Sequence, residues 1–225
     1  MATFKLNIAA MDHCPAPAVV ADAMEEFGLP SDEEFGVLTS MATEQAVFAS
    51  ILRRTQQAVQ KLDEETQEIM TTAIEKVSVW PLGLFPDRKR IELYEGSATA
   101  IEQIGGFLGS YLALPVVLNP IELDVVAAVQ RLQRTTERFQ LKSVRLKAFA
   151  HNSYVEGPYA PKFLDSESGL DFMQEHIDEV TSAVVRFQGP GGRATVTLTP
   201  NSCFRYTLSN EDDNSAIQSL LRKLA

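Results

Sequence analysis

Apolar and polar residues alternate along many short stretches of this chain, and a period of two residues is typical of β-strands. Phe4, Leu6 and Ile8 share one face of the first such stretch, opposite Lys5 and Asn7. The alternation in 139–149 slips by one residue, which predicts a β-bulge. The predicted strands are 3–10, 45–52, 76–84, 89–95, 114–118, 139–149, 181–188, 193–199 and 203–208.

Several other segments place their apolar residues three and four positions apart, which is typical of amphipathic helices. Ser97 is a suitable cap for one helix, and Asn119-Pro120 suits the start of another, because proline fits the first helical turn. The remaining predicted helices are 18–27, 168–180 and 211–224.

Residues 55–77 allow two interpretations. The acidic turn at 63–66 is compatible with a β-hairpin, whereas the abundance of Gln, Glu and Met is compatible with one amphipathic helix. We favour the hairpin and keep the helix as the alternative. Residues 85–88 (Phe-Pro-Asp-Arg) form a good turn sequence between two paired strands.

The order of these elements predicts an α+β protein with one or two antiparallel sheets, each with helices packed on one face. A strand-rich half, residues 1–95, contains an acidic loop at 31–34, and a helix-and-strand half covers residues 96–225. We expect the two halves to pack as one compact unit. Residues 151–167 are expected to form a long polar loop.

The composition is that of an ordinary globular protein, with 45% apolar and 22% charged residues among 225. No stretch approaches the eighteen or so apolar residues that cross a bilayer, and the N-terminus has no secretory signal pattern. We therefore expect a cytoplasmic protein without membrane contact. Its two cysteines, Cys14 and Cys203, are expected to be reduced thiols.

The net charge of -10 is spread unevenly. Residues 1–80 hold 13 acidic and 5 basic residues, whereas residues 81–150 hold 7 acidic and 9 basic residues. Phosphate backbones are bound largely by Lys and Arg, so an acidic surface disfavours nucleic acid. Only the middle third of the chain weakens that objection.

One basic segment stands out, because residues 131–147 carry six bases and one acid, Glu137. Three of its arginines are spaced three and four apart, which places them on one helix face. A concentrated basic surface in an acidic protein is suited to nucleic acid or an acidic protein region. The alternative, equally favoured, is a solvated face that pairs with the acidic stretch 22–34. The candidate partner-binding residues are Arg131, Arg134, Arg138, Lys142, Arg145, Lys147, Arg88, Lys89 and Arg90.

No stretch carries a recognisable catalytic, metal or cofactor motif, and we predict no metal, no cofactor and no enzymatic activity. The neighbours Asp12, His13 and Cys14 point in different directions, whereas zinc ligands are spaced along the chain. The best alternative for an active site is the segment 151–154 (His-Asn-Ser-Tyr) together with Asp165, because functional groups gather in long loops.

Residues 85–210 resemble the bacterial recombination-associated protein RdgC family. The resemblance lies in 90–95 (RIELYE), the helix after it, 114–118 (LPVVL), 120–123 (PIEL) and the strands of 180–208. Members of that family form ring-shaped dimers that enclose duplex DNA without base preference. The resemblance therefore implies DNA as a partner, although this chain is shorter than the family and more acidic in its first third.

These observations together predict a non-enzymatic bacterial or phage interaction protein that uses the basic surface around 131–147. A protein partner or self-association is expected, and nucleic acid is a possible partner. The alternatives are a structural subunit that docks through its acidic N-terminal third, and an enzyme with a site in 151–167.

Overall fold

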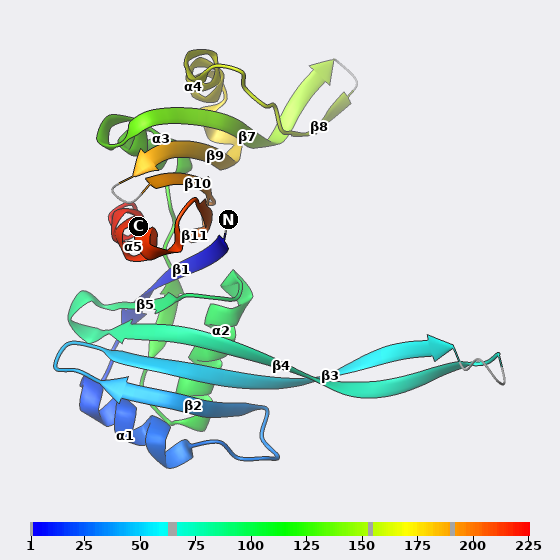
Figure 1. Cartoon of the computed structure of the whole chain (residues 1–225), viewed down its shortest axis with the longest axis vertical. Helices are drawn as coiled ribbons and strands as arrows, with labels where there is room; N and C mark the ends of the chain where they lie inside the picture. Colours follow the sequence, from blue (N-terminus) through cyan, green and yellow to red (C-terminus); the bar gives the residue numbers. More distant parts are fainter. Residues whose placement is uncertain (1, 63–66, 153–154, 190–191) are drawn as a thin grey trace. The chain divides into compact units, whose positions relative to one another are not determined.

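The computed structural model describes residues 2–62, 67–152, 155–189 and 192–225, without the side chains of residues 98, 151, 152 and 155. These residues form five α-helices and eleven strands, and the predicted antiparallel α+β class is confirmed (Figure 1). None of the described helices has the length and apolarity to cross a membrane.

The chain divides into two compact units, which we call unit 1 and unit 2. Unit 1 comprises Met1–Ala10, Gly96–Ile101 and Leu118–Ala225, and unit 2 comprises Met11–Glu95 and Glu102–Val117. The division predicted after residue 95 coincides with one of these boundaries. Residues 1–10, however, group with the second half of the chain, and residues 102–117 group with the first half.

Unit 1 contains a five-stranded antiparallel core, extended by a short hairpin strand at one edge. Residues of β1 pair with β11, and the meander predicted for the C-terminal strands is observed as β9, β10 and β11. Strand β7 pairs with β9 and β8, and its register shifts between Leu141 and Ser143 where the bulge was predicted. The order is β1 (Ala2–Asp12), β11 (Cys203–Leu208), β10 (Gly192–Leu198), β9 (Val180–Gly189), β7 (Glu137–Asn152) and β8 (Val155–Tyr159).

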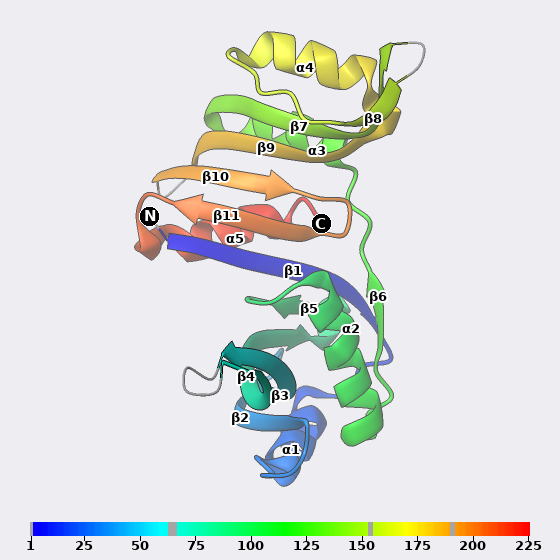
Figure 2. The same cartoon turned by 90° about the vertical axis from the view of Figure 1, so that its right-hand side faces the viewer.

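Two helices cover one face of this sheet, α3 (Val125–Thr135) and α5 (Asn214–Arg222). In Figure 2 both helices lie behind the strands, so the uncovered face of the sheet is toward the viewer. The Tyr206 side chain joins β11 to α5, because its hydroxyl lies 2.6 Å from the Asn214 Oδ1 and accepts a hydrogen bond from Gln218. The covered face is apolar, and its fully buried side chains include Leu141, Val185, Val196, Phe204 and Leu208.

Two predictions in unit 1 are wrong at the level of element boundaries. The helix expected from Asn119-Pro120 begins at Val125, because Asp124 caps it by accepting a hydrogen bond from the Ala127 backbone N–H at 2.9 Å; Pro120 instead ends β6 (Val117–Pro120). The long loop predicted at 151–167 contains strand β8, and α4 (Ser166–Glu175) follows it.

Unit 2 contains four further antiparallel strands, in the order β2 (Phe35–Ala42), β3 (Val47–Leu62), β4 (Ile69–Phe85) and β5 (Arg90–Leu93). Helix α1 (Pro17–Phe27) packs on β2 and β3, and the last residues of α2 (Ala98–Gly106) continue into a π-helical turn, Phe107–Tyr111. The aromatic rings of Phe27, Phe35, Phe107 and Tyr111 contact one another; Phe35 and Phe107 are buried in the core, whereas Tyr111 is exposed.

The hairpin interpretation of residues 55–77 is confirmed and the helix alternative is wrong. Strands β3 and β4 pair continuously from Val47 opposite Leu84 to Leu62 opposite Ile69, while the turn at 63–66 lies outside the described residues. Strand β2 was not predicted, because apolar residues stand side by side in its sequence and hide the alternation. The predicted pairing around 85–88 is observed, with Phe85 opposite Arg90 and a 3-10 turn, Pro86–Arg88, between them.

Candidate nucleic-acid interface

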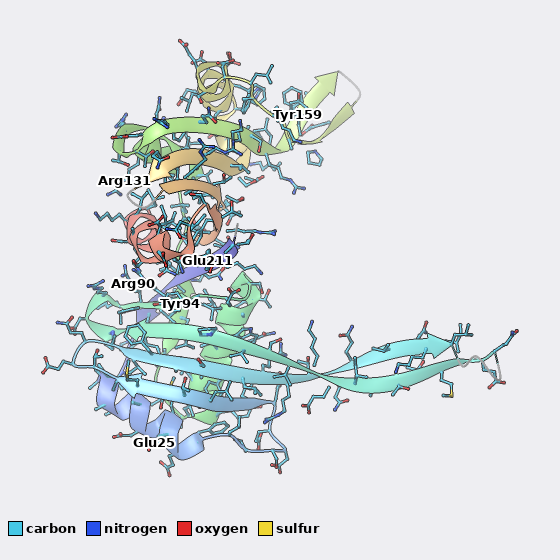
Figure 3. The ribbon with its side chains drawn as sticks, viewed as in Figure 1. Glu25, Arg90, Tyr94, Arg131, Tyr159 and Glu211 are labelled. Atoms are coloured by element: carbon cyan, nitrogen blue, oxygen red, sulfur yellow. The ribbon has the colours of Figure 1, made fainter. Side chains whose placement is uncertain are left out.

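The six bases predicted as one surface in 131–147 are divided between a helix and a strand. Arg131 and Arg134 lie on α3, on the helix side of the unit 1 sheet, and both side chains are exposed. The Arg131 guanidinium donates a hydrogen bond to the Lys223 backbone carbonyl at 2.5 Å, next to α5 (Figure 3). These two arginines therefore face away from the open side of the sheet.

The other four bases lie along β7, and they are not equivalent. Arg145 is exposed and stands opposite Ser182 of β9. Lys147 lies 3.8 Å from the Glu179 carboxylate and donates a hydrogen bond to the Asp178 carbonyl at 3.1 Å. Lys142 is half-buried beside the bulge.

The remaining candidates, Arg88, Lys89 and Arg90, belong to unit 2. Arg90 forms an ion pair of 2.9 Å with Glu92, whose side chain is fully buried, and its guanidinium lies over the Phe85 ring. Figure 3 shows Arg90 beside Tyr94, whose hydroxyl donates to the same carboxylate at 3.1 Å. Arg90 therefore has an internal structural role, and Lys89 has a left-handed backbone (φ 48°) that closes the turn.

The strand register identifies the side chains on the open face of the unit 1 sheet, because directly opposed residues in antiparallel strands point to the same side. The open face is the one opposite the helices, shown toward the viewer in Figure 2. One row across five strands is Thr3, Thr207, Thr195, Arg186 and Gln140, and the next is Lys5, Arg205, Thr197, Val184 and Ser143.

Three arginines from different strands line one pair of adjoining hollows on this side. Arg138, Arg186 and Arg193 border a cavity of about 230 Å³ together with two glutamines, and Arg186 and Arg193 continue into a neighbouring cavity of about 310 Å³. The Arg186 Nε donates a hydrogen bond to the Thr195 hydroxyl at 3.4 Å, which holds its guanidinium along the sheet. Arg138 reaches the same place because its backbone turns into the left-handed region (φ 49°).

We call the resulting surface the basic face. It consists of Lys5, Arg138, Arg145, Arg186, Arg193 and Arg205.

The bases of this face have no carboxylate partners within the described part of the chain: none of the six forms an ion pair there. The register of the described strands also places an acidic residue, Glu137, on this side, opposite Gln188. Arginine and lysine side chains that are not neutralised within the protein are available to bind an external anion.

The charge of the molecule also separates by unit. Unit 1 contains 13 acidic and 13 basic residues, whereas unit 2 contains 17 acidic and 7 basic residues and thus carries the whole net charge of -10. The basic face therefore belongs to an electrically neutral unit, so the acidity of the chain as a whole is not an argument against anion binding by unit 1.

Sequence reasoning missed four members of the basic face: Lys5, Arg186, Arg193 and Arg205. Each is an isolated base within its own strand, so no local cluster marks it. Each of these bases lies two residues from another open-face side chain of its own strand, which is the one pattern that they share. Only the pairing of β1, β11, β10 and β9 brings the four together.

Of the residues considered for catalysis or metal binding, the structure describes Asp12, His13, Cys14 and Asp165, but not the side chains of 151–154. Burial raises the pKa of the Cys14 thiol to about 11, so it is protonated and unreactive at neutral pH. Burial also raises the pKa of Cys203, although the positive charge of Lys5 acts in the opposite direction. Within the described residues, no group of three or more Cys, His, Asp or Glu side chains is placed to hold a metal ion.

Asp165 has a structural role at the start of α4. Its carboxylate accepts a hydrogen bond from the Ser168 backbone N–H at 2.8 Å, which lowers the pKa of Asp165. Its candidate companions in 151–154 lie outside the residues whose side chains are described.

Comparison of the sequence with protein-family models gave no match, and neither did comparison with curated proteins. The relation to the RdgC family thus stays an expectation from the sequence.

Proposed function

We propose that this chain is a non-enzymatic, cytoplasmic nucleic-acid-binding protein that holds the phosphate backbone on the basic face of unit 1. The observation that carries the proposal is the gathering of six bases from β1, β7, β9, β10 and β11 on the open sheet face, without ion-pair partners in the described structure. The resemblance of residues 85–210 to a DNA-binding family favours the same class of ligand.

The chemistry of the face is suited to phosphate rather than to a base edge. Arginine presents several N–H donors in a planar fork that matches phosphate oxygens, and the neighbouring threonine hydroxyls add donors to the same oxygens. Thr3, Thr195, Thr197 and Thr207 lie in the two rows that carry Lys5, Arg186 and Arg205. A sheet face with these groups can contact a phosphate backbone across several strands.

Charge reversal tests this proposal. Arg186→Glu combined with Arg193→Glu should weaken binding of a labelled duplex of mixed sequence by at least about 100-fold in fluorescence anisotropy, because two charge-assisted hydrogen bonds at about 1.5–3 kcal/mol each are lost and repulsion is added. The matched control is Arg131→Glu with Arg134→Glu, which removes the same charge from the helix side.

The control pair should retain affinity within about threefold, the residual effect expected from long-range charge alone. Equal losses in both double variants would contradict the basic face as the binding site and would favour a diffuse electrostatic attraction. A wild-type chain that binds neither duplex nor single-stranded nucleic acid at low salt would contradict the function itself.

A further inference from the structure

Three arginines of the basic face converge at one end of the unit 1 sheet, where β9 ends and β10 begins (Figure 2). They border the cavity of about 230 Å³ together with Gln140 and Gln188. We call this cavity the arginine hollow, and its three arginines are Arg138, Arg186 and Arg193. Each of them comes from a different strand, so the hollow exists only when β7, β9 and β10 are paired.

A β-bulge brings Arg138 to the hollow. Between Glu137 and Gln140, two residues of β7 stand opposite one residue of β9. Bulges of this kind change the direction of a side chain, and the backbone of Arg138 is in the left-handed region (φ 49°). Phe139, the other residue of the bulge, lines a different cavity, between α3 and α4. The bulge thus separates two neighbouring side chains and gives the arginine to the hollow.

The other two arginines are held in place by hydrogen bonds. The Arg186 Nε donates to the Thr195 hydroxyl at 3.4 Å. The Arg193 backbone N–H donates to the Ser209 Oγ at 3.1 Å, and its carbonyl accepts from the Ser209 N–H at 3.1 Å. A guanidinium has five N–H donors, so the bond to Thr195 leaves the two terminal nitrogens of Arg186 for a ligand. Fixing these groups in advance lowers the entropy that binding costs.

The charge of the hollow matches a phosphate monoester better than a phosphodiester. Glu137, which lies opposite Gln188, is the acidic residue that the register of the described strands places beside it. Three guanidinium groups and one carboxylate leave a net charge of +2. A phosphate monoester carries about -1.5 to -2 at neutral pH, whereas each diester of a nucleic-acid backbone carries a single negative charge.

The donors of the hollow also suit a monoester. Its phosphate group has three strong acceptor oxygens, and arginine binds phosphate oxygens in pairs through its planar fork. The amide groups of Gln140 and Gln188 add donors without adding charge. Three forks around one phosphate group are therefore used fully only when all three of its outer oxygens are free.

The surroundings of the hollow favour nucleic acid as the source of this phosphate. Arg186 and Arg193 also border the neighbouring cavity of about 310 Å³, which the hydroxyl-bearing Thr195, Thr207 and Ser209 line as well. A strand whose first phosphate occupies the hollow would place its next phosphates over these hydroxyls and the rest of the basic face. A phosphorylated protein side chain has no second phosphate to use them.

We propose that the arginine hollow binds the terminal phosphate monoester of a nucleic-acid strand, so that unit 1 prefers 5′-phosphorylated ends to internal backbone. This inference rests on the proposed function, because it assigns one end of the basic face to the end of a bound strand. It adds a preference that a uniform basic surface would not have.

The test uses three short blunt duplexes of one mixed sequence, labelled at a 3′ end, which differ only in their 5′ ends. The ends are a phosphate, a hydroxyl, or a methylphosphate, which has nearly the size of the phosphate but a single negative charge. In fluorescence anisotropy at one salt concentration, the wild-type chain should bind the phosphorylated duplex at least about tenfold more tightly than either of the others, as expected for one added charge-assisted contact.

The variant that tests the hollow is Arg138→Gln with Arg193→Gln, which should bind all three duplexes within about twofold of one another. The matched control is Arg145→Gln with Arg205→Gln, which removes two arginines of the same face that do not line the hollow. The control should weaken binding of all three duplexes and keep the preference for the phosphorylated one. Circular dichroism checks that both variants are folded, and the comparison of the three ends with the wild type needs no variant.

Equal wild-type affinity for phosphate and methylphosphate ends would overturn the proposal, and so would a preference that survives in the hollow variant. A free 5′-mononucleotide that displaces the duplex at equal concentration would also overturn it, because the hollow would then not require a strand. Failure of the proposed function has a different result. If only the phosphorylated duplex binds, internal backbone binding is wrong and the assignment of the hollow stands.

Discussion

Units 1 and 2 have the same general construction, an antiparallel sheet covered by helices on one face, but their open faces differ in chemistry. The open face of unit 1 alternates Thr, Gln and Ser with six bases, whereas that of unit 2 mixes the exposed apolar Phe48, Val77 and Val79 with Arg54 and Glu75. Unit 1, which has the basic face, is electrically neutral, and unit 2 carries the net charge of -10. The same architecture thus carries a basic open face in unit 1 and a mixed apolar and polar open face in unit 2.

This comparison also explains why global charge is a poor guide to the ligand of this chain. An average of -10 describes unit 2 and hides the absence of net charge in unit 1. Local potential, set by the side chains that share one sheet face, determines which ligand is attracted.

The largest expected effect comes from a core substitution, which distinguishes the core of unit 2 from that of unit 1. Phe107→Ala removes a fully buried ring from the aromatic cluster of unit 2, and it should lower the free energy of unfolding by about 3–5 kcal/mol. Nucleic-acid affinity, measured at a temperature where the variant is folded, should not change.

The matched change in unit 1 is Phe204→Ala, because Phe204 is also fully buried and precedes Arg205 in β11. This substitution should lower both the stability and the affinity. Equal losses of affinity in the two variants would contradict the assignment of binding to unit 1.

A second prediction concerns the buried ion pair of unit 2. Arg90→Met removes the guanidinium from Glu92, whose side chain has no exposed surface, and it should cost about 3 kcal/mol in chemical denaturation, because a buried charge loses its counter-charge. Lys147→Met, which breaks the exposed 3.8 Å pair with Glu179 in unit 1, should cost at most about 1 kcal/mol. The reverse order would contradict the assignment of the stronger ion pair to Arg90 and Glu92.

The third prediction compares two arginines from the same basic segment. Arg145→Glu, on the open face, should lower duplex affinity by about tenfold, as expected for one lost phosphate contact of about 1.5 kcal/mol. Arg134→Glu, on α3, should change affinity less than twofold. Titrations of both variants at one salt concentration make this comparison, and a larger effect at Arg134 would place the ligand on the helix side.

The smallest expected effect is at the start of α4. Asp165→Ala should slightly lower the melting temperature at neutral pH, because the Ser168 N–H loses its acceptor, whereas Asp165→Asn should retain most of the cap. The pKa of Asp165 is lowered in the folded state. Its stabilising contribution is therefore present above the unfolded pKa of about 3.9 and is lost as the pH falls through the folded pKa. Melting curves of the wild type and Asp165→Asn should accordingly converge at acidic pH.

Much of the fold was predictable because most strands have one covered face, and alternation then appears directly in the sequence. Phe4, Leu6 and Ile8 in β1 illustrate this, as does the slip in β7 that marks the bulge between Leu141 and Ser143. Strand β2 was not predictable in this way, because the register shift between Val37 and Thr39 interrupts its alternation.

The candidate site was predictable only in part, because a sheet face is assembled from residues far apart in the sequence. Arg138 and Arg145 were found through the local concentration of bases in 131–147. Arg186 and Arg205 could not be found without the pairing of β9, β10 and β11. Arg131, which a simple helix pattern grouped with the others, lies on α3, on the helix side of the sheet.

The most direct test of the account is the salt dependence of duplex binding by the wild type and by Arg186→Glu with Arg193→Glu. If the basic face neutralises five or six phosphates, the plot of log K against log salt should have a slope of about -5 for the wild type. The double variant should show a slope smaller by about two. A wild-type slope near zero, or the same slope in both proteins, would contradict the claim that unit 1 binds a phosphate backbone on its open face.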